Sequence, residues 1–277
     1  MPPSLPRALL VTATAALLAA CGGGSDPKPA VNGFQVQSMM FGKAATFYVG
    51  GVHLRNTMVA DTGGACTNPS FASSSTPELA VLNCTVERVG EFPLTLRSAE
   101  GAVLYQTTLT VPKPQVAMLT DAGNITLELD PAAAPVTVRN FLTYVGNGYY
   151  RSTLFHRVIP GFVVQGGGYT TGMVKKPGQL APITLESNNG LRNVRGSVAM
   201  ARTSAPDSAT SEFFINLVDN TSLDYRSASN PGYAVFGAVT AGLDVVDTIA
   251  AKPTGTFNGF NDVPLTDITI TLALQVK

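Results

Sequence analysis

The sequence has 277 residues, of which 45% are hydrophobic and 13% are charged, so one large domain or two ordinary ones can bury a core. Because 18 basic and 18 acidic side chains give zero net charge and no long Lys/Arg run occurs, the composition argues against nucleic-acid binding. The two histidines and three cysteines form no cluster at metal-ligand spacing, so no metal site is expected.

Residues 1–20 have the pattern of an export signal. Arg7 supplies a positive charge, and the apolar stretch after it is too short to span a bilayer but suits a signal peptide. Small residues before Cys21 resemble the cleavage box of bacterial lipoproteins. This resemblance implies that Cys21 is lipidated and anchors the chain in a membrane through more than one acyl chain. Residues 21–31 then form a flexible tether; an ordinary secretory signal that ends near a cysteine is the alternative.

An exported and acylated chain is expected in the bacterial cell envelope, facing the periplasm. Gly22 follows Cys21, so the chain lacks the Asp-type signal for retention in the inner membrane, and the outer membrane is the default. The leaflet that carries the anchor stays open.

Residues 32–111 are predicted to form a β domain without helices. Short runs with β-branched residues alternate with Gly, Asn and Ser/Thr/Pro stretches. The predicted strands are 45–49, 79–86, 92–96 and 103–111. About 80 residues with several short strands and one cysteine pair resemble a small immunoglobulin-like (Ig-like) sandwich.

The cysteine pair of this domain is Cys66 and Cys84. Export would place both in an oxidising compartment, where a disulfide is the expected state of a pair. The bridge would close a loop of about 19 residues and stabilise the domain by roughly 3 kcal/mol. Two buried free thiols are the alternative.

Residues 112–115 contain two prolines and are predicted to be a stiff linker before a second domain, residues 116–277. In that domain, 116–120 and 124–129 suit a hairpin. Pro135 can begin a helix whose apolar positions recur every three or four residues. A second helix is expected at 243–250. Further strands are expected at 162–165, 196–201, 212–217, 234–239 and 265–274. Many strands with two helices predict a mainly β fold, a closed antiparallel barrel capped by the helices.

The most informative stretch is FHRVIPGFVVQGGG, residues 155–168. Arg157 carries a permanent charge a few residues before an apolar run, which is followed by the amide of Gln165 and three glycines. Such a pattern can hold an apolar ring against a wall and direct a cation at an atom beside the ring. It suits recognition of a proline and of the peptide bond that precedes it.

Several motifs in the same order resemble the cyclophilin-type peptidyl-prolyl isomerases, and most closely the short bacterial periplasmic branch. They are 155–162, 165–167, 191–193, 196–203, 212–215 and 235–237. The resemblance covers about residues 116–277 and implies an eight-stranded antiparallel barrel with two helices, which binds substrates in a groove on its outside. It also implies isomerisation of X-Pro bonds without a cofactor.

The chemistry places Arg157 first among the candidate catalytic residues. Amide resonance gives a prolyl bond a rotation barrier of roughly 18–20 kcal/mol, and the twisted transition state loses that resonance. A donor directed at the freed lone pair of the proline nitrogen binds the twisted state better than either planar state. The resemblance assigns Phe162 to the catalytic set, and Gln165 would steady Arg157 and bind the substrate backbone.

The resemblance also implies a set of substrate-binding residues. Phe162, Val163, Phe214 and Leu223 correspond to the proline pocket, and Val163 stands where many members have the longer methionine. Ala201 corresponds to a neighbouring pocket, and the main chain of Arg202 would pair with the residue before proline. The remaining positions near the groove are Glu212 and Tyr233.

Two positions depart from the family pattern. Glu212 stands where the family usually has Gln; we expect its carboxylate to pair with Arg157 and hold that cation away from substrate, so that Glu212→Gln would raise the specificity constant. Ser222 replaces a large aromatic residue, which argues against binding of the inhibitor cyclosporin.

The sequence therefore predicts a monomeric, lipid-anchored prolyl isomerase that assists folding of proline-containing polypeptides in the envelope. One alternative is a non-catalytic chaperone or scaffold that binds proline segments. Another is an adhesin whose Ig-like domain binds the partner. Retention of Arg157, Phe162, Gln165 and Phe214 favours catalysis over both.

Overall fold

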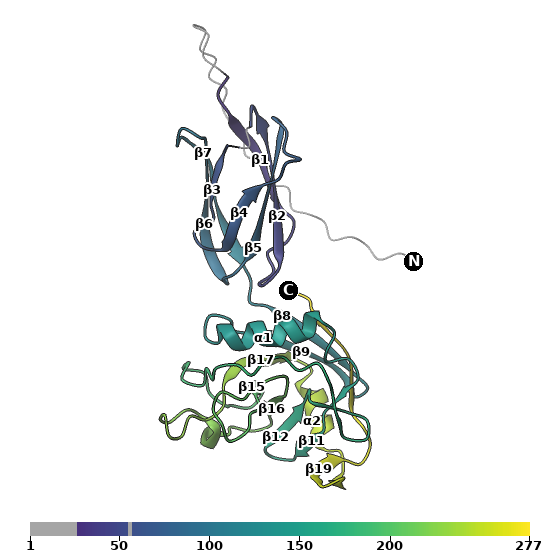
Figure 1. The fold of residues 1–277 in the computed structure, drawn as a ribbon. Helices are drawn as coiled ribbons and strands as arrows, with labels where there is room; N and C mark the ends of the chain where they lie inside the picture. Colours follow the sequence, from purple (N-terminus) through teal and green to yellow (C-terminus); the bar gives the residue numbers. More distant parts are fainter. Residues whose placement is uncertain (1–26, 55–56) are drawn as a thin grey trace, which may run out of the picture. The chain divides into compact units, whose positions relative to one another are not determined.

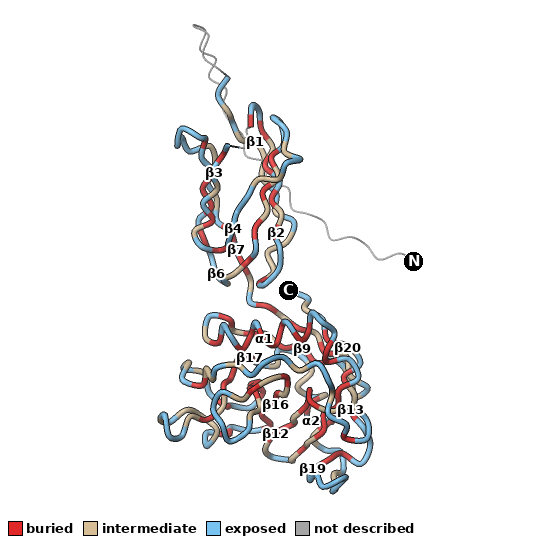
Figure 2. Tube along the Cα trace, in the orientation of Figure 1, coloured by how far each residue is buried: buried red, intermediate tan, exposed pale blue. Residues whose placement is uncertain are grey.

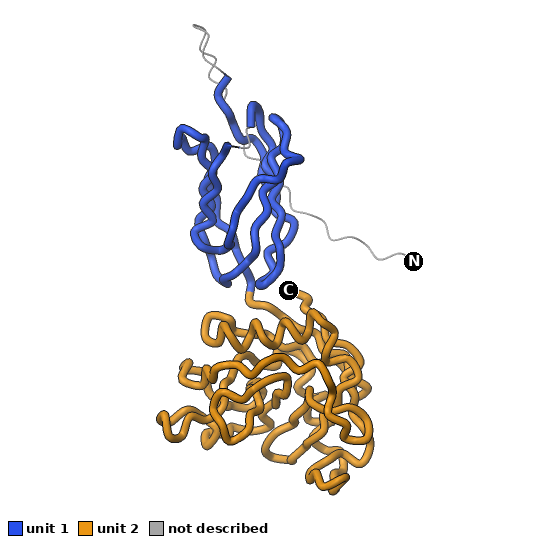
Figure 3. The backbone as a smooth tube through the Cα atoms, viewed as in Figure 1, with its two compact units in different colours: residues 1–112 blue, residues 113–277 orange. Residues whose placement is uncertain are grey.

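The computed structural model describes residues 27–54 and 57–277 (Figure 1). The chain divides into two compact units, residues 1–112 and residues 113–277 (Figure 3). The predicted signal 1–20, and with it the lipidation site Cys21, lies outside the described residues. Within the described ranges, no helix is both long and apolar enough to cross a membrane.

The described part of the first unit consists of seven antiparallel strands in two sheets. The four-stranded sheet has the order β1 (Ala30–Val36), β2 (Ala44–Val52), β5 (Leu79–Val86) and β4 (Cys66–Phe71). The three-stranded sheet has the order β3 (Val59–Asp61), β6 (Gly90–Arg97) and β7 (Val103–Val111).

The two sheets of this unit enclose one hydrophobic core. Residues alternate along β2, so that Ala45, Phe47 and Val49 are fully buried while their neighbours face outward. Leu82 of β5 and Leu94 of β6 join them in the same cluster, which the buried segments in Figure 2 follow along both sheets. This period of two is what a half-buried strand requires. The unit is a β-sandwich.

Cys66 and Cys84 form the predicted disulfide, with their Cα atoms 5.6 Å apart. The bridge joins β4 to β5, which are neighbours in one sheet because Ser70 pairs with Asn83 and Cys66 with Val86. In antibody domains the corresponding bridge joins the two sheets. The bridge here therefore braces one sheet instead of joining the two layers.

The second unit, all of whose residues are described, is built around a nine-stranded antiparallel sheet. The strand order is β10 (Thr153–Leu154), β20 (Thr269–Gln275), β8 (Gln115–Thr120), β9 (Gly123–Leu129), β17 (Val235–Ala241), β15 (Ser197–Met200), β16 (Phe213–Asn216), β12 (Val163–Gly166) and β11 (Arg157–Ile159). Two hairpins stand outside this sheet: β13 (Tyr169–Thr170) with β14 (Val174–Lys175), and β18 (Thr254–Phe257) with β19 (Phe260–Pro264).

The nine strands differ from the eight that the family resemblance implies. The difference arises at Phe155 and His156, which separate β10 from β11. The chain pairs with β20 before this point and with β12 after it. Because the chain changes partner here, β10 and β11 count as two strands, and they stand at opposite ends of the strand order.

Two α-helices pack on the sheet at the positions that the periodicity predicts. Helix α1 (Pro135–Gly146) begins with proline, and its Val138 and Phe141 are fully buried. The ring of Phe141 contacts the rings of Tyr150, Phe213 and Phe236 at centroid distances of 5.0 to 5.6 Å. Helix α2 (Leu243–Ala250) packs against β9 and β12. Each helix buries one face, as its spacing of three and four residues dictates.

Along β11, β12, β15 and β16, which are neighbours at one end of the strand order, the side chains alternate between the two faces of the sheet. The side chains of Val158, Val164, Val198 and Ile215 are all fully buried, and they lie beside one another in the strand register. Because successive residues of a strand point to opposite faces, the residues between them form a second row on the other face. That second row carries the candidate site.

Replacement of both cysteines by serine tests the contribution of the disulfide. We expect Cys66→Ser with Cys84→Ser to lower the free energy of unfolding of the first unit by roughly 3 kcal/mol, because the loop of the unfolded chain is no longer closed. Hydrogen exchange of the amides in β2 and β5 measures this unit separately from the second. A loss below about 1 kcal/mol would contradict the expectation, and the amides of β12 and β16 in the second unit serve as the internal control.

Candidate active site

The candidate site is a row of residues in register across five strands. Arg157 pairs with Gln165, Gln165 with Phe214, Phe214 with Ala199, and Ala199 with Val235. Paired residues of antiparallel strands project from the same face, with Cβ atoms about 4.5–5.5 Å apart. The register therefore places the cation, the amide and an aromatic ring side by side although they come from three different strands.

An apolar cluster continues this row. Its buried members are Val163, Ala199, Phe214 and Val235, and its half-buried members are Phe162, Leu191, Ala201, Leu223 and Tyr233. All six apolar and aromatic residues predicted for the substrate groove belong to this one cluster. The half-buried members leave apolar surface open to a ligand.

Arg157, Gln165, Glu212 and His156 form a hydrogen-bonded network at the polar end of the row. The Nη1 atom of Arg157 donates to Oε1 of Gln165 at 3.3 Å, and Nε2 of Gln165 donates to Oε2 of Glu212 at 2.9 Å. The Nε2 atom of His156 lies 3.3 Å from the same carboxylate oxygen. The imidazole ring also packs on Tyr169 at 4.7 Å. His156 therefore packs on Tyr169 and contacts the Glu212 carboxylate within this network.

The ion pair expected between Glu212 and Arg157 is not formed, and the structure corrects this expectation. Among the described residues, the carboxylate contacts His156 and Gln165, and no contact joins it to the guanidinium. A carboxylate can only accept hydrogen bonds, so it must face the amide nitrogen of Gln165, and the amide oxygen is left facing Arg157. The carboxylate fixes the orientation of the amide and does not sequester the cation, and the predicted rise in activity for Glu212→Gln loses its physical basis.

Glu212 is ionised in this network. Burial raises the pKa of this carboxyl, but hydrogen bonds from His156 and Gln165 together with nearby positive charge outweigh burial and hold the pKa below its ordinary value. The charged form is the form that accepts two hydrogen bonds. The network therefore stays intact at neutral pH.

The three glycines after Gln165 are required by close approach. A Cβ on Gly168 would lie 2.5 Å from Cγ of Glu212, and a Cβ on Gly166 would lie 2.9 Å from the carbonyl oxygen of Leu154. Gly167 has a φ of +87°, which residues with a side chain rarely adopt. The absence of side chains on these glycines makes room for the Glu212 carboxylate.

Asp262 of β19 reaches the other side of Arg157 and was not found by sequence reasoning. Its Oδ2 lies 3.8 Å from Nε of Arg157, and both side chains are about two-fifths exposed. Phe260 and Asn261 of the same hairpin line a small cavity of about 190 Å³ with Arg157 and His156. No local signal in the sequence links residues 254–264 to Arg157, because the hairpin reaches it only in the folded chain.

The side chain of Arg202 is engaged by Gly232 and Tyr233, whereas its backbone groups are not paired within the described residues. Its guanidinium donates to the carbonyl oxygen of Gly232 at 2.8 and 2.9 Å and lies 4.7 Å from the centre of the Tyr233 ring. Tyr233 in turn meets Phe214 edge to face at 5.5 Å. Among the described residues, none makes a backbone hydrogen bond with the amide or carbonyl of Arg202. Both groups can therefore pair with an extended peptide.

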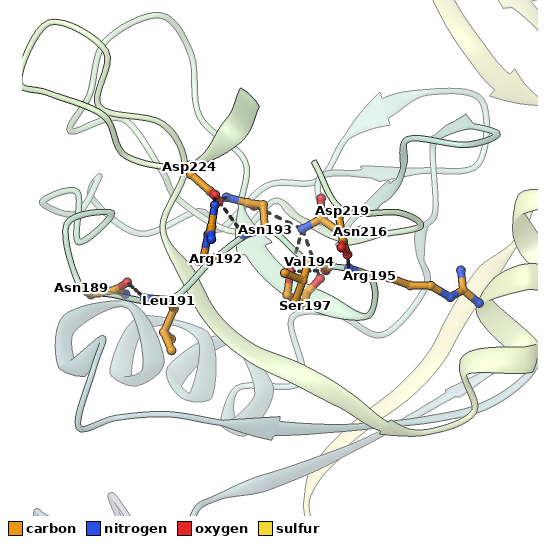
Figure 4. Close-up of polar contacts among 10 residues, drawn as sticks. All are labelled: Asn189, Leu191, Arg192, Asn193, Val194, Arg195, Ser197, Asn216, Asp219 and Asp224. Carbon is orange, nitrogen blue, oxygen red and sulfur yellow. Dashed lines mark hydrogen bonds and ion pairs between the residues drawn. The ribbon is translucent and has the colours of Figure 1, made fainter. Parts of the chain in front are cut away.

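The 3-10 turn η1 (Thr221–Leu223) brings Leu223 to the cluster and leaves Ser222 exposed. Nδ2 of Asn220 donates to the carbonyl oxygen of Phe162 at 2.9 Å, which fixes the start of the turn. At the end of the turn, the carboxylate of Asp224 accepts from the backbone nitrogen of Asn193 at 2.7 Å (Figure 4). Polar contacts at both ends thus set the position of an apolar side chain.

The structure brings together the ten predicted catalytic and substrate-binding residues, but in two groups. Arg157, Gln165 and Glu212 form the polar end; the six apolar and aromatic residues form the cluster, and Arg202 packs on Tyr233. Sequence reasoning missed Leu191, Ala199 and Val235 of the cluster. Within the described residues, no three His, Cys, Asp or Glu side chains gather as metal ligands.

This arrangement can hold an apolar ring and present a cation to an atom beside it. The network contains no activated nucleophile, and its carboxylate is engaged by two donors. Chemistry that needs only binding and electrostatic stabilisation of a transition state suits such a site.

Comparison with known proteins gives a family match. The family model described as cyclophilin type peptidyl-prolyl cis-trans isomerase/CLD matches residues 115–274. A peptidyl-prolyl cis-trans isomerase of Acinetobacter baylyi is 51% identical over 162 residues, which are 58% of this chain and 85% of that protein. Peptidyl-prolyl cis-trans isomerase B of Escherichia coli is 49% identical over 153 residues, 54% of this chain and 93% of that protein.

A solved structure has the same fold in this region. The crystal structure of a cyclophilin type peptidyl-prolyl cis-trans isomerase from Cryptosporidium parvum superposes with a TM-score of 0.50 at 24% identity, covering 60% of this chain and 98% of the other. All these matches concern a little over half of the chain.

The pKa of Glu212 predicts how the stability of the second unit depends on pH. Because this pKa is lower in the fold than its ordinary value of 4.5, the carboxylate contributes stability that is present above pH 4.5 and is lost as pH falls through the lower folded value. We expect Glu212→Gln to remove this contribution. Hydrogen exchange in β12 and β16, measured at pH 7 and then at stepwise lower pH, should show a smaller acid loss in the variant. An equal loss in both proteins would contradict the expectation.

Proposed function

The chain belongs to the cyclophilin-type peptidyl-prolyl cis-trans isomerases, and we propose that it isomerises X-Pro bonds of exported proteins and thereby assists their folding in the bacterial cell envelope. The enzyme class follows from the family. The substrates, the compartment and the roles of individual residues are the content of the proposal.

The single observation that carries the mechanism is the register of Arg157, Gln165 and Phe214 on β11, β12 and β16. A proline ring against Phe162, Phe214 and the rest of the apolar cluster would place its nitrogen beside the guanidinium. Because the slow step is loss of amide resonance, with a barrier of roughly 18–20 kcal/mol, the useful contact is one made only in the twisted state.

In this mechanism Arg157 donates to the pyramidal nitrogen, whose lone pair is free only when the bond is twisted. Gln165 keeps the guanidinium in place through its oxygen, and Glu212 keeps the amide in the orientation that allows this. The open backbone of Arg202 pairs with the residue before proline. No bond is formed or broken and no proton is transferred, so pre-organisation of these donors is the whole catalytic contribution.

The envelope location rests on two features outside the isomerase unit. Residues 1–20 have the pattern of an export signal that ends at a lipidation box, and the first unit contains a disulfide. Disulfides persist in oxidising compartments such as the periplasm. In this proposal the chain is a monomer anchored through Cys21 to the outer membrane. The sandwich is an Ig-like spacer that carries the isomerase away from that membrane.

Replacement of Arg157 tests catalysis against simple binding of proline segments. We expect Arg157→Ala to lower kcat/KM for a proline peptide about 100-fold or more, because one pre-organised donor is lost, with most of the loss in kcat. Arg151→Ala is the matched control, since Arg151 is exposed and lines no part of the site. Equal activity of Arg157→Ala and wild type would overturn the mechanism. Peptide binding by a wild type that lacks isomerase activity would favour the non-catalytic chaperone.

Mass spectrometry of the chain purified from membranes tests the anchor. We expect the mature protein to begin at Cys21 with more than one acyl chain, and Cys21→Ser to release it from the membrane fraction, since stable anchoring takes two chains or more. An unmodified mature N-terminus at a different residue would contradict lipidation and leave the ordinary secretory signal.

A further inference from the structure

A polar cavity of about 490 Å³ lies beside the apolar cluster and has no role in the mechanism above. The side chains that matter for its chemistry are Leu191, Arg192, Thr221, Asp224, Tyr225 and Arg226. All of them belong to the second unit. The cavity combines two guanidinium groups with one carboxylate.

The carboxylate of this cavity is already engaged. Oδ1 of Asp224 accepts from the backbone nitrogen of Asn193 at 2.7 Å and from its Nδ2 at 3.2 Å, and Oδ2 accepts from Nε of Arg192 at 3.1 Å. Figure 4 shows Arg192 and Asn193 turned toward Asp224, whereas the side chain of Arg195 extends away. Burial raises the pKa of Asp224, but these donors outweigh burial and lower it, so the group is charged. Asp224 is a structural anion that fixes the loop.

The two arginines retain donors that nothing else uses. Arg192 uses Nε on Asp224 and is about two-thirds exposed, and its terminal nitrogens have no partner among the described residues. The Arg226 guanidinium is exposed and likewise has no side-chain partner in the described part of the chain. With Asp224 counted, the cavity carries one net positive charge. That charge matches a single carboxylate better than a phosphate group of about two negative charges.

The cavity and the apolar cluster are neighbours that share Leu191 and the turn η1. Leu191 lines the cavity and also packs in the cluster. The turn η1 presents Thr221 to the cavity and Leu223 to the cluster. A three-residue 3-10 turn is about 6 Å long, and an extended peptide advances roughly 3.3–3.6 Å per residue. About two residues of extended peptide therefore span the length of the turn, and a path around the turn takes up to about four.

We propose that this cavity is a specificity site for a substrate carboxylate, which Arg192 and Arg226 bind two to four residues from the proline. The proposal rests on the proposed isomerase function and adds a substrate class to it: proline segments with a nearby Asp or Glu, or with a nearby free C-terminus. The guanidinium fork suits a carboxylate because it can donate two parallel hydrogen bonds. Since the site is exposed, the preference is modest and falls with salt.

The test measures kcat/KM of the purified full chain on matched proline peptides. Each peptide carries Glu or Gln at one position from four residues before to four residues after proline, and all are amidated at the C-terminus. A second set ends in a free carboxylate at the same distances and separates the two sources of the group. We expect a Glu-to-Gln ratio of roughly fivefold for at least one position at low salt, which decreases at higher ionic strength.

Charge variants then assign the preference to the cavity. We expect Arg226→Gln to bring the ratio close to one and Arg226→Glu to invert it, whereas the matched control Arg151→Gln should leave both the ratio and the activity unchanged. A ratio near one at every position in wild type, for both peptide sets, would overturn the proposal. So would a ratio that survives Arg226→Glu.

Failure of this inference and failure of the isomerase function give different results. If the site inference alone fails, Gln peptides are isomerised and Glu confers no advantage. If the function fails, neither peptide is isomerised, and a carboxylate-dependent binding signal from titration of the same peptides still reports on the cavity.

Discussion

The antiparallel register of β11, β12 and β16 is the constraint on which the rest of this site depends. It places Arg157, Gln165 and Phe214 in one row on one face, while Val158, Val164 and Ile215 fill the core from the other. A shift of one residue would exchange the two faces, burying a guanidinium and exposing the core. The hydrophobic core thus fixes the geometry of the site through the strand register that both share.

The carboxylate of Glu212 fixes the orientation of a neighbouring amide. As a pure acceptor, it leaves the amide of Gln165 only one orientation, with nitrogen toward Glu212 and oxygen toward Arg157. The glycine turn at 166–168 is the steric counterpart, because a methyl group on Gly168 would occupy the space of the Glu212 side chain. Glu212, which differs from the Gln usual in the family, therefore fits this position, and Arg157 stays beside the apolar cluster.

The loop that carries Leu223 is held by polar contacts at both of its ends. Asn220 binds the backbone at Phe162, and Asp224 binds Asn193 and Arg192. One short turn therefore separates an apolar surface from a cavity of net positive charge. The contacts that position Leu223 also shape the neighbouring cavity. In the proposal above, that cavity distinguishes substrates by the residues that flank their proline.

The sequence by itself determined the local elements and the candidate residues. The ranges of both helices and of about half of the strands follow from periods of 3.6 and 2. Motif order placed Arg157, Phe162, Gln165 and Phe214 in one site, because these signals lie in contiguous stretches of chain. Only the tertiary structure decided the partner of Glu212, the approach of Asp262 to Arg157, the ninth strand and the single sheet that the disulfide braces. These depend on contacts between residues far apart in sequence, such as Gln165 and Glu212 at a separation of 47, and sheet register and loop packing fix such contacts only when the whole domain folds.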